Sequence, residues 1–305
     1  MATGIVFNPR TTLGALEVGA LAWACYFVFG VLTSQVYVYS SRFPTDSAKL
    51  KTLVVVVWLM QLGQMVSVGW ALFTYMILDY GNPEAVVGPV PKSFAVGVLL
   101  GGILVICVQG FFSFRLYAFS KGLFVPISIW VVISVRFIAV MGIVIISHRP
   151  ISIVQLERQW GRLFIVSWGV SVVSDLSITG ALVAVFLAQR PSGQKRTVAL
   201  IDKLIIWTLE TGMLTSANII VEVVCFYTMK DNFIWVVFYV LQPLLYSNSL
   251  LVSLNSRATL RAINDREVSL QSLHPTAAID FANRMQVTPD TEGIIITASF
   301  KMPHV

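Results

Sequence analysis

Two long apolar runs near the end of the chain, separated by three polar residues, limit what this sequence can fold into. The runs cover residues 203–229 and 233–254, and only Lys230, Asp231 and Asn232 lie between them. Each run is long enough to cross the hydrocarbon core of a bilayer, which takes about 20 helical residues. The stretch 200–257 therefore predicts a tight hairpin of two membrane-spanning helices.

Five earlier apolar runs have the same character. Together with the hairpin they predict seven membrane spans, at residues 13–39, 52–78, 93–119, 122–147, 161–188, 203–229 and 233–254. Charged residues make up 12% of the chain, whereas a soluble domain has about 25%. The first run is too long for the apolar part of a signal peptide, so we expect it to stay as an anchor. The expected fold is an all-α bundle of seven transmembrane helices in the plasma membrane or an internal membrane.

The distribution of Lys and Arg predicts the orientation of this bundle. Fourteen of the 21 basic residues lie in the odd-numbered loops and the C-terminal segment, and six lie in the N-terminus and the even-numbered loops. Basic residues concentrate on the cytoplasmic side, although the fourth loop has three of its own. We expect the N-terminus outside, a transmembrane domain at 1–257, and a cytoplasmic tail at 258–305 that begins with a short helix and is then largely disordered.

Two charged residues near the middle of predicted spans are expected to lie in the interior of the bundle. Arg136 lies in the fourth span and Asp175 in the fifth, each about half-way across the membrane. An unpaired charge at this depth costs on the order of several kcal/mol or more. The sequence therefore predicts an ion pair between the two. The pair suits either a static clamp between helices or a site for a ligand or proton.

Other polar residues in the spans are expected to face the inside of the bundle for the same reason. Gln61 and Gln64 are three residues apart and share a helix face. Glu210 and Glu222 are 12 residues apart, which at 100° per residue points them about 120° away from each other, so they cannot share one site. The candidate ligand or polar-core residues are Arg136, Asp175, Glu210, Thr215, Asn218, Gln242, Tyr246, Asn248, Gln61, Gln64 and Gln109.

Two backbone signals concern helix packing. Gly97 and Gly101 are four residues apart in the third span, a spacing that lets helices approach closely, and we expect it to serve packing within the bundle. Pro243 in the seventh span is predicted to kink its helix and to free a backbone carbonyl that an Asn or Ser side chain satisfies.

Common catalytic and cofactor signatures are missing from the sequence. Nucleotide-binding P-loop, zinc-protease and serine-hydrolase motifs do not occur, and no lysine lies mid-span in the seventh run to hold a retinal. The three histidines lie outside the spans, and the three cysteines lie inside them as expected free thiols. We therefore expect no catalytic residues, no metal, no cofactor and no nucleic-acid partner.

Four short segments carry a family resemblance. They are Arg42-Phe43-Pro44 with Asp46, Leu50 and Lys51; Tyr75 with Tyr80-Gly81-Asn82-Pro83; Thr211 to Ser216; and Tyr246 to Arg257. With them the chain resembles, over residues 13–257, the multi-pass membrane proteins of basidiomycete fungi grouped as domain of unknown function 6534. The resemblance implies an Asp at position 175 and a membrane bundle, but no activity. The second span, with Gln61 and Gln64 where Asp and His are common, and Glu210 in place of Asn depart from the family pattern.

Three classes of function agree with these features. A receptor-like or sensory protein is the leading hypothesis, since seven spans, a polar seventh helix and a Ser/Thr-bearing tail resemble a receptor layout. The alternative is a transporter or channel that uses the polar residues of the spans as a pathway. An intramembrane enzyme ranks third. The expected partner is the lipid bilayer, and the first two hypotheses leave room for a small-molecule ligand or substrate and for a cytoplasmic partner of the tail.

Overall fold

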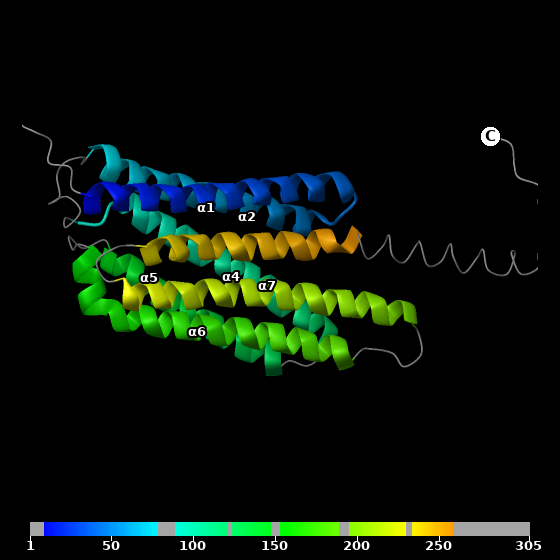
Figure 1. Ribbon diagram of the computed structural model, residues 1–305. Coiled ribbons are helices and arrows are strands. Elements are labelled where there is room, and N and C mark those ends of the chain that lie inside the picture. Colours follow the sequence, from blue (N-terminus) through cyan, green and yellow to red (C-terminus); the bar gives the residue numbers. More distant parts are fainter. Residues whose placement is uncertain are drawn as a thin grey trace, which may run out of the picture. The chain divides into compact units, whose positions relative to one another are not determined.

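The computed structural model describes residues 9–78, 89–120, 124–147, 153–188, 195–229 and 234–258 (Figure 1). At several helix ends, 9–22, 119–120, 124–125, 153–154 and 195–200, and at Met76, only the backbone is described. The tail predicted at 258–305 lies outside the described residues except for Ala258, and the structure leaves its predicted helix and disorder untested.

All regular structure in the described ranges is helical. The elements are α1 (Pro9–Arg42), α2 (Ala48–Phe73) with a π-helical continuation η1 (Thr74–Leu78), α4 (Lys92–Ser120), α5 (Phe124–Ser147), α6 (Ile153–Ala188), α7 (Lys195–Thr228) and a last helix, Ile234–Ala258, which is unlabelled and yellow to orange in Figure 1. Successive helices run in opposite directions along one bundle (Figure 1). The predicted all-α bundle is confirmed.

Six of these helices are long and apolar enough to cross a membrane. They are α2, α4, α5, α6, α7 and the last helix. A chain with six such helices is a multi-pass membrane protein, and its surroundings are a lipid bilayer. The predicted crossing by α1, which would make seven spans, and the predicted orientation stay predictions.

Two helices begin earlier than the hydropathy of the sequence predicts. Helix α6 begins at Ile153 and α7 at Lys195, each eight residues before the apolar run that marked them. The 36 residues of α6 extend roughly 54 Å at 1.5 Å per residue, longer than a hydrocarbon core of about 30 Å. The added turns contain Gln155, Glu157 and Arg158, residue types that form helices readily and that are expected outside the apolar layer.

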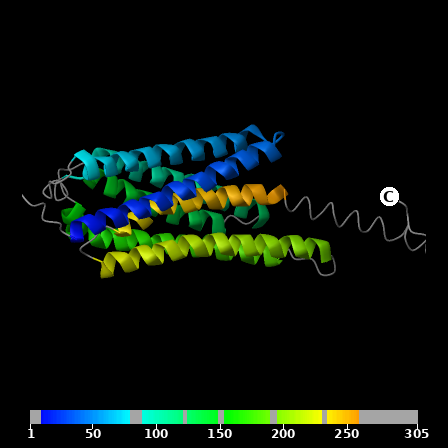
Figure 2. The same ribbon diagram turned by 45° about the horizontal axis from the view of Figure 1, so that its top comes forward.

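The last helix lies at the centre of the bundle. Within its most apolar window, 61% of the residues are buried, against 22–50% for the other membrane-spanning helices. In Figure 1 it runs between the pair α1 and α2 and the pair α6 and α7, and in Figure 2 α1 crosses it. The helix that the sequence marked as the second half of the hairpin is therefore the one that most of the others pack around.

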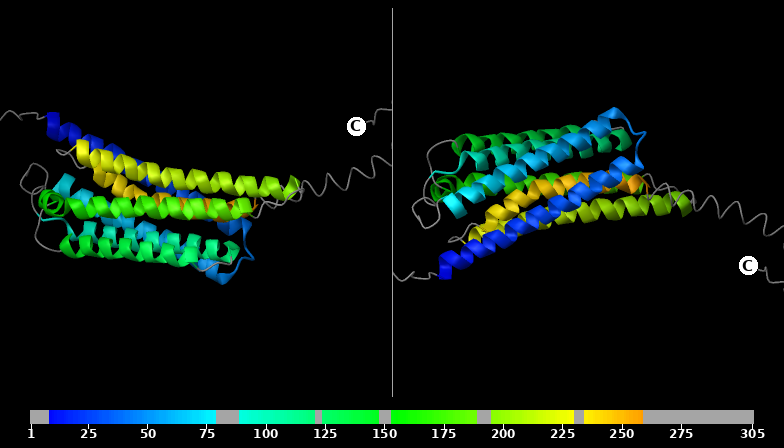
Figure 3. Two further views of the ribbon diagram at one scale, coloured as in Figure 1. Left: turned by 90° about the horizontal axis from the view of Figure 1, so that it is seen from below. Right: turned by 90° about the horizontal axis from the view of Figure 1, so that it is seen from above.

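Helix α4 packs against α2, α5 and α6, and the two views of Figure 3 show how closely these helices lie together. Two of its four glycines, Gly97 and Gly101, make this possible. A side chain at Gly97 would come within 3.0 Å of Val68 on α2, and one at Gly101 would come within 2.9 Å of Pro243 on the last helix. The predicted role of both glycines in packing within the bundle is confirmed.

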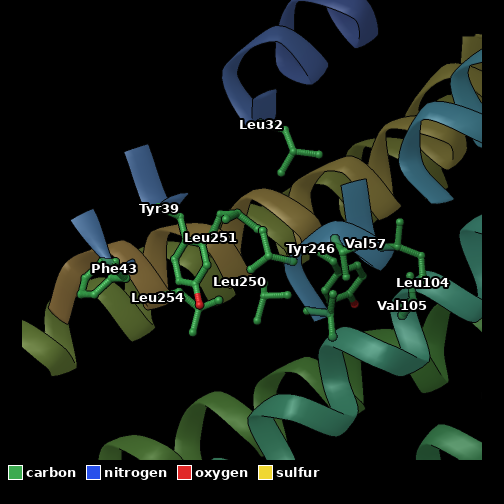
Figure 4. Packing of buried hydrophobic residues seen from close by; sticks show 12 residues of the cluster. Leu32, Tyr39, Phe43, Val57, Leu104, Val105, Tyr246, Leu250, Leu251 and Leu254 are labelled. Carbon is green, nitrogen blue, oxygen red and sulfur yellow. The ribbon is translucent and has the colours of Figure 1, made fainter. Parts of the chain in front are cut away.

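Apolar side chains from four helices form one core cluster, which includes Leu32 of α1, Val57 of α2, Leu104 of α4 and Leu250 of the last helix (Figure 4). A second cluster holds four aromatic rings that meet edge to face or tilted, from Phe164, Trp168, Phe226 and Trp235. The apolar residues on the outside of the bundle include Phe27, Val66, Ile138, Ile145 and Val166. Apolar residues thus face outward and polar residues face the interior, which is the arrangement that a bilayer requires.

The last helix is attached at its C-terminal end to the turn between α1 and α2. The guanidinium of Arg257 forms an ion pair with Asp46, with 2.5 Å between Nη2 and Oδ2. It also stacks over Phe43, with Cζ 4.5 Å from the ring centroid, and Tyr39 donates a hydrogen bond to Asp46 (2.9 Å). The first and last segments of the family resemblance therefore meet in space.

Candidate functional site

Asp175 on α6 is the acceptor at the centre of a buried polar network. Its side chain is 5% exposed. The hydroxyl of Tyr246 on the last helix donates to it, 2.6 Å from each carboxylate oxygen. Gln109 Nε2 on α4 donates to Oδ1 (3.0 Å), and Thr215 of α7 lies beside the carboxylate. Four helices thus contribute to holding one carboxylate.

Arg136 on α5 completes the network from the other side. It is 7% exposed, and its Nη1 donates to the Tyr246 hydroxyl at 3.0 Å. Its Cζ also lies 5.3 Å from the centroid of the Tyr246 ring, a favourable position for a cation. The predicted direct ion pair between Arg136 and Asp175 is wrong: the phenol hydroxyl, which both accepts and donates, lies between the two charges and joins them.

The predicted amide residues of α2 also face inward. Gln61 donates to Gln64 Oε1 (2.8 Å) and accepts from the hydroxyl of Ser247 (3.1 Å). Gln64 Nε2 lies 3.4 Å from the carbonyl oxygen of Val240. The expectation that both glutamines share one face and point inward is confirmed, and both hydrogen-bond to the last helix.

Two asparagines join the last helix to its neighbours. Asn248 accepts a hydrogen bond from Gln35 of α1 (3.1 Å). Asn218 of α7 donates to the carbonyl of Phe238 (3.0 Å). The last helix continues through Pro243, whose missing N–H frees the carbonyl one turn earlier, at Tyr239. The side chains of Asn218 and Gln64 donate hydrogen bonds to the carbonyls of Phe238 and Val240, the residues on either side of Tyr239.

Glu210, predicted as part of the polar core, is exposed on α7. The buried face of this helix follows Thr215, Ile219, Glu222 and Phe226, spaced three or four residues apart. Glu210 lies off that face, because it points about 120° away from Glu222. The expectation that the two glutamates do not share a site is confirmed, and the inclusion of Glu210 among the inward-facing residues is wrong.

A cavity of about 30 Å³, here called the Gln242 cavity, lies next to Arg136. Its polar lining includes Gln64, Arg136, Ser167, Ser171, Tyr239 and Gln242, together with the indole of Trp168. Glycines 101 and 102 of α4 also line it. Several polar groups that converge on one buried space are typical of a ligand or water site.

A second cavity, the Thr215 cavity, lies next to Asp175 and Tyr246. It measures about 40 Å³ and is lined by Gln109, Asp175, Thr208, Thr211, Thr215 and Tyr246 among others. A third cavity of about 10 Å³, next to Arg115, shares Phe112, Thr208 and Thr211 with it. On α4, α6 and the last helix, the residues that line the Thr215 cavity follow directly those that line the Gln242 cavity. The cavities therefore follow one another along the bundle. Between the first and the second lies the hydrogen-bonded chain from Arg136 through Tyr246 to Asp175, here called the relay.

Sequence reasoning missed Trp168 and left Glu222 out of the candidate site residues. Trp168 is 2% exposed and Glu222 is 0% exposed. The indole nitrogen of Trp168 and both carboxylate oxygens of Glu222 make no hydrogen bond of good geometry, although the two side chains lie close enough to interact. Glu222 was visible in the sequence as an acidic residue within a span. Trp168 gave no such signal, because a tryptophan in an apolar run looks the same whether its N–H is satisfied or not.

Residues 171–259 match the family of unknown function DUF6534. The matched part includes Asp175, Thr215, Tyr246 and Arg257, and it excludes Gln109 and Arg136. It therefore contains the carboxylate and the phenol of the network. The match supports the family suggested by the resemblance, and it names neither a source organism nor an activity. No curated protein matches the chain, and no solved structure matches it.

Proposed function

We propose that this chain is a receptor-like or sensory membrane protein whose bundle changes state at the Arg136–Tyr246–Asp175 relay. The observation that carries the proposal is the position of the relay between two polar cavities. A ligand or a change of charge in the Gln242 cavity meets Arg136, which lines it. A shift of Arg136 acts on Tyr246 and through it on Asp175, on a different helix.

The size of the cavities favours a receptor over a transporter of organic solutes. Pockets for such molecules measure about 300–1,000 Å³, whereas the three cavities here measure about 30, 40 and 10 Å³. The hydrogen bonds of Tyr246 also interrupt the polar path between them. A closed relay suits a protein that transmits a conformational change better than one that conducts.

The proposal includes a full membrane topology. In it α1 is a seventh span, the N-terminus lies outside, and the tail lies in the cytoplasm, where it meets a partner. The Lys and Arg distribution supports this orientation. The Gln242 cavity then lies in the outer half of the membrane, and the Thr215 cavity lies in the cytoplasmic half.

A transporter or channel is the second candidate, and one observation favours it. The three cavities follow one another along a single axis, and the second and third share lining residues. In this alternative, rearrangement of the relay at the Tyr246 hydroxyl joins the first two. Such a path suits protons or small ions.

Flux through vesicles that contain the purified protein separates the two candidates. We expect wild-type protein under a pH or ion gradient to give no more flux than Asp175→Asn, because the relay keeps the path closed. Glu210→Gln, an exposed acid on α7, is the matched control. Flux in the wild type and in Glu210→Gln that disappears in Asp175→Asn would overturn the receptor proposal and support the alternative.

A further inference from the structure

Two buried nitrogen donors in the Gln242 cavity make no hydrogen bond of good geometry. They are Nε1 of Trp168 and Nε2 of Gln242, on side chains that are 2% and 3% exposed. Nε1 of Trp168 has the Glu222 carboxylate beside it, so that carboxylate competes with any species bound in the cavity. A buried N–H without a hydrogen bond costs about 1–3 kcal/mol. Both side chains line the cavity, so a bound species there is placed to satisfy them.

The other groups in the lining add donors to these two. Arg136 donates one hydrogen bond from Nη1 to Tyr246. A guanidinium has five N–H donors in all, so further donors remain. The serine hydroxyl of Ser171 donates to the carbonyl of Ser167. Gln64 uses its Nε2 on Val240. Every unpartnered buried atom among the lining residues described is thus a donor, and one donor group is positively charged.

The volume of the cavity limits what can accept from these donors. A single water needs about 10–15 Å³ of such space, so about 30 Å³ accommodates no more than two waters or one somewhat larger atom. Organic carboxylates and phosphate esters require the larger pockets typical of small-molecule sites.

We infer that the Gln242 cavity binds one monatomic anion of chloride size, held by Arg136, Trp168 and Gln242. The inference rests on the proposed function in taking this cavity as the ligand-facing one, and it adds the chemical class of the ligand. Charge-assisted donors and neutral N–H groups around a small buried space form an anion site without any metal.

Glu222 lies just outside the lining and opposes such an anion when it is ionised. The charged and titratable groups that face it are Arg136 of α5, Tyr239 of the last helix and Cys225 of its own helix, with the Trp168 indole of α6 beside them. Removal of the charge at Glu222 therefore leaves anion binding intact or tightens it, whereas a cation site would lose a ligand.

Equilibrium binding of radioactive chloride to the full-length protein in lipid nanodiscs tests the inference. We expect saturable binding with one ion per chain. Gln242→Leu and Trp168→Phe each remove one hydrogen bond to a charged species and should weaken binding about tenfold or more. Trp160→Phe, the same change at an exposed position of the same helix, should bind like the wild type. Size-exclusion profiles of the variants show that they are folded.

Two results overturn the inference. The first is no saturable chloride binding by folded wild-type protein, or binding that Gln242→Leu and Trp168→Phe leave unchanged. The second is weaker binding in Glu222→Gln, or saturable binding of radioactive sodium that this variant abolishes. The outcome is distinguishable from that of the vesicle experiment. Chloride binding together with ion flux would support the anion site and contradict the receptor proposal. Absence of both chloride binding and ion flux would contradict the anion site alone.

Discussion

At the scale of single residues, Tyr246 explains how a membrane interior holds two opposite charges that do not touch. Its hydroxyl donates to Asp175 and accepts from Arg136, and its ring lies beside the guanidinium. A phenol can do both because it has one donor and two lone pairs. Each charge therefore has a hydrogen-bonded partner, as burial requires.

Replacement of Tyr246 by Phe removes this bridge and keeps the ring. We expect the free energy of unfolding in mixed detergent micelles to fall by about 1–3 kcal/mol, because two charged groups each lose a hydrogen bond. The exposed Tyr117 of α4 supplies the control: Tyr117→Phe should change stability by less than about 0.5 kcal/mol. Equal effects of the two variants would show that Tyr246 does not bridge the charges.

The sequence alone located Arg136, Asp175 and Tyr246 as inward-facing residues, since polar groups at membrane depth have to turn inward. It did not predict the relay. Depth in a span is visible from residue counting, but the rotation of each helix about its axis is set by packing against neighbours. For the same reason Glu210 was placed inside although it is exposed.

At the scale of helices, the contact between α6 and α7 depends on one glycine. A side chain at Gly212 would clash with Thr179 Oγ1 and come within 3.1 Å of its Cβ. This contact lies next to the Thr215 cavity, which both residues line. The glycine therefore sets how close α7 lies to Asp175.

Gly212→Ala should lower the free energy of unfolding by about 1–3 kcal/mol, since the added methyl overpacks the contact. At the neighbouring Gly180 of α6, a methyl group would have no other atom within 4 Å, and Gly180→Ala should be neutral or slightly stabilising. Thr179→Ala in the Gly212→Ala background should recover part of the loss. No difference between the two glycine variants would mean that α6 and α7 do not meet here.

The attachment of the last helix at Asp46 gives a further prediction. Asp46→Asn should lower stability by about 1 kcal/mol or less, because the ion pair with Arg257 is partly solvated. Arg257 also keeps its contact with the Phe43 ring, and the asparagine that replaces Asp46 can still accept the hydrogen bond from Tyr39. Arg257→Lys should not substitute for the wild type, since lysine cannot keep both the bidentate geometry and the ring contact. Thermal unfolding at low and high salt measures both effects, and a loss that is equal at both salt concentrations would contradict the ion pair.

The existence of six membrane helices was predictable from the sequence, and their ends were less so. Hydropathy marks where a helix is apolar, not where it is helical, and this is why α6 and α7 extend eight residues beyond their apolar runs. The π-helical end of α2 at Thr74–Leu78 has no hydropathy signal at all. The central position of the last helix follows from its many polar residues, which required protein neighbours.

At the scale of the whole molecule, topology decides which cavity meets which compartment. We expect a reporter enzyme fused after Val305 to be active only in the cytoplasm, and one fused before Met1 to be active only outside, as the Lys and Arg distribution predicts. Reporters on the same side would mean that α1 does not cross. Reporters on exchanged sides would place the Gln242 cavity in the cytoplasmic half.

The relay also ties separate helices into one unit, because Arg136, Asp175, Tyr246 and Gln109 come from α5, α6, the last helix and α4. A receptor that switches at this point needs energetic coupling between residues that do not touch. That coupling is measurable without any knowledge of the ligand.

A double-mutant cycle of Arg136→Gln and Asp175→Asn, measured once in the wild-type background and once in Tyr246→Phe, is the most direct test. We expect a coupling energy of about 1 kcal/mol or more in the wild type that falls to less than half when the Tyr246 hydroxyl is absent. Additive destabilisation by the two changes in the wild type, or a coupling that Tyr246→Phe leaves unchanged, would contradict the relay.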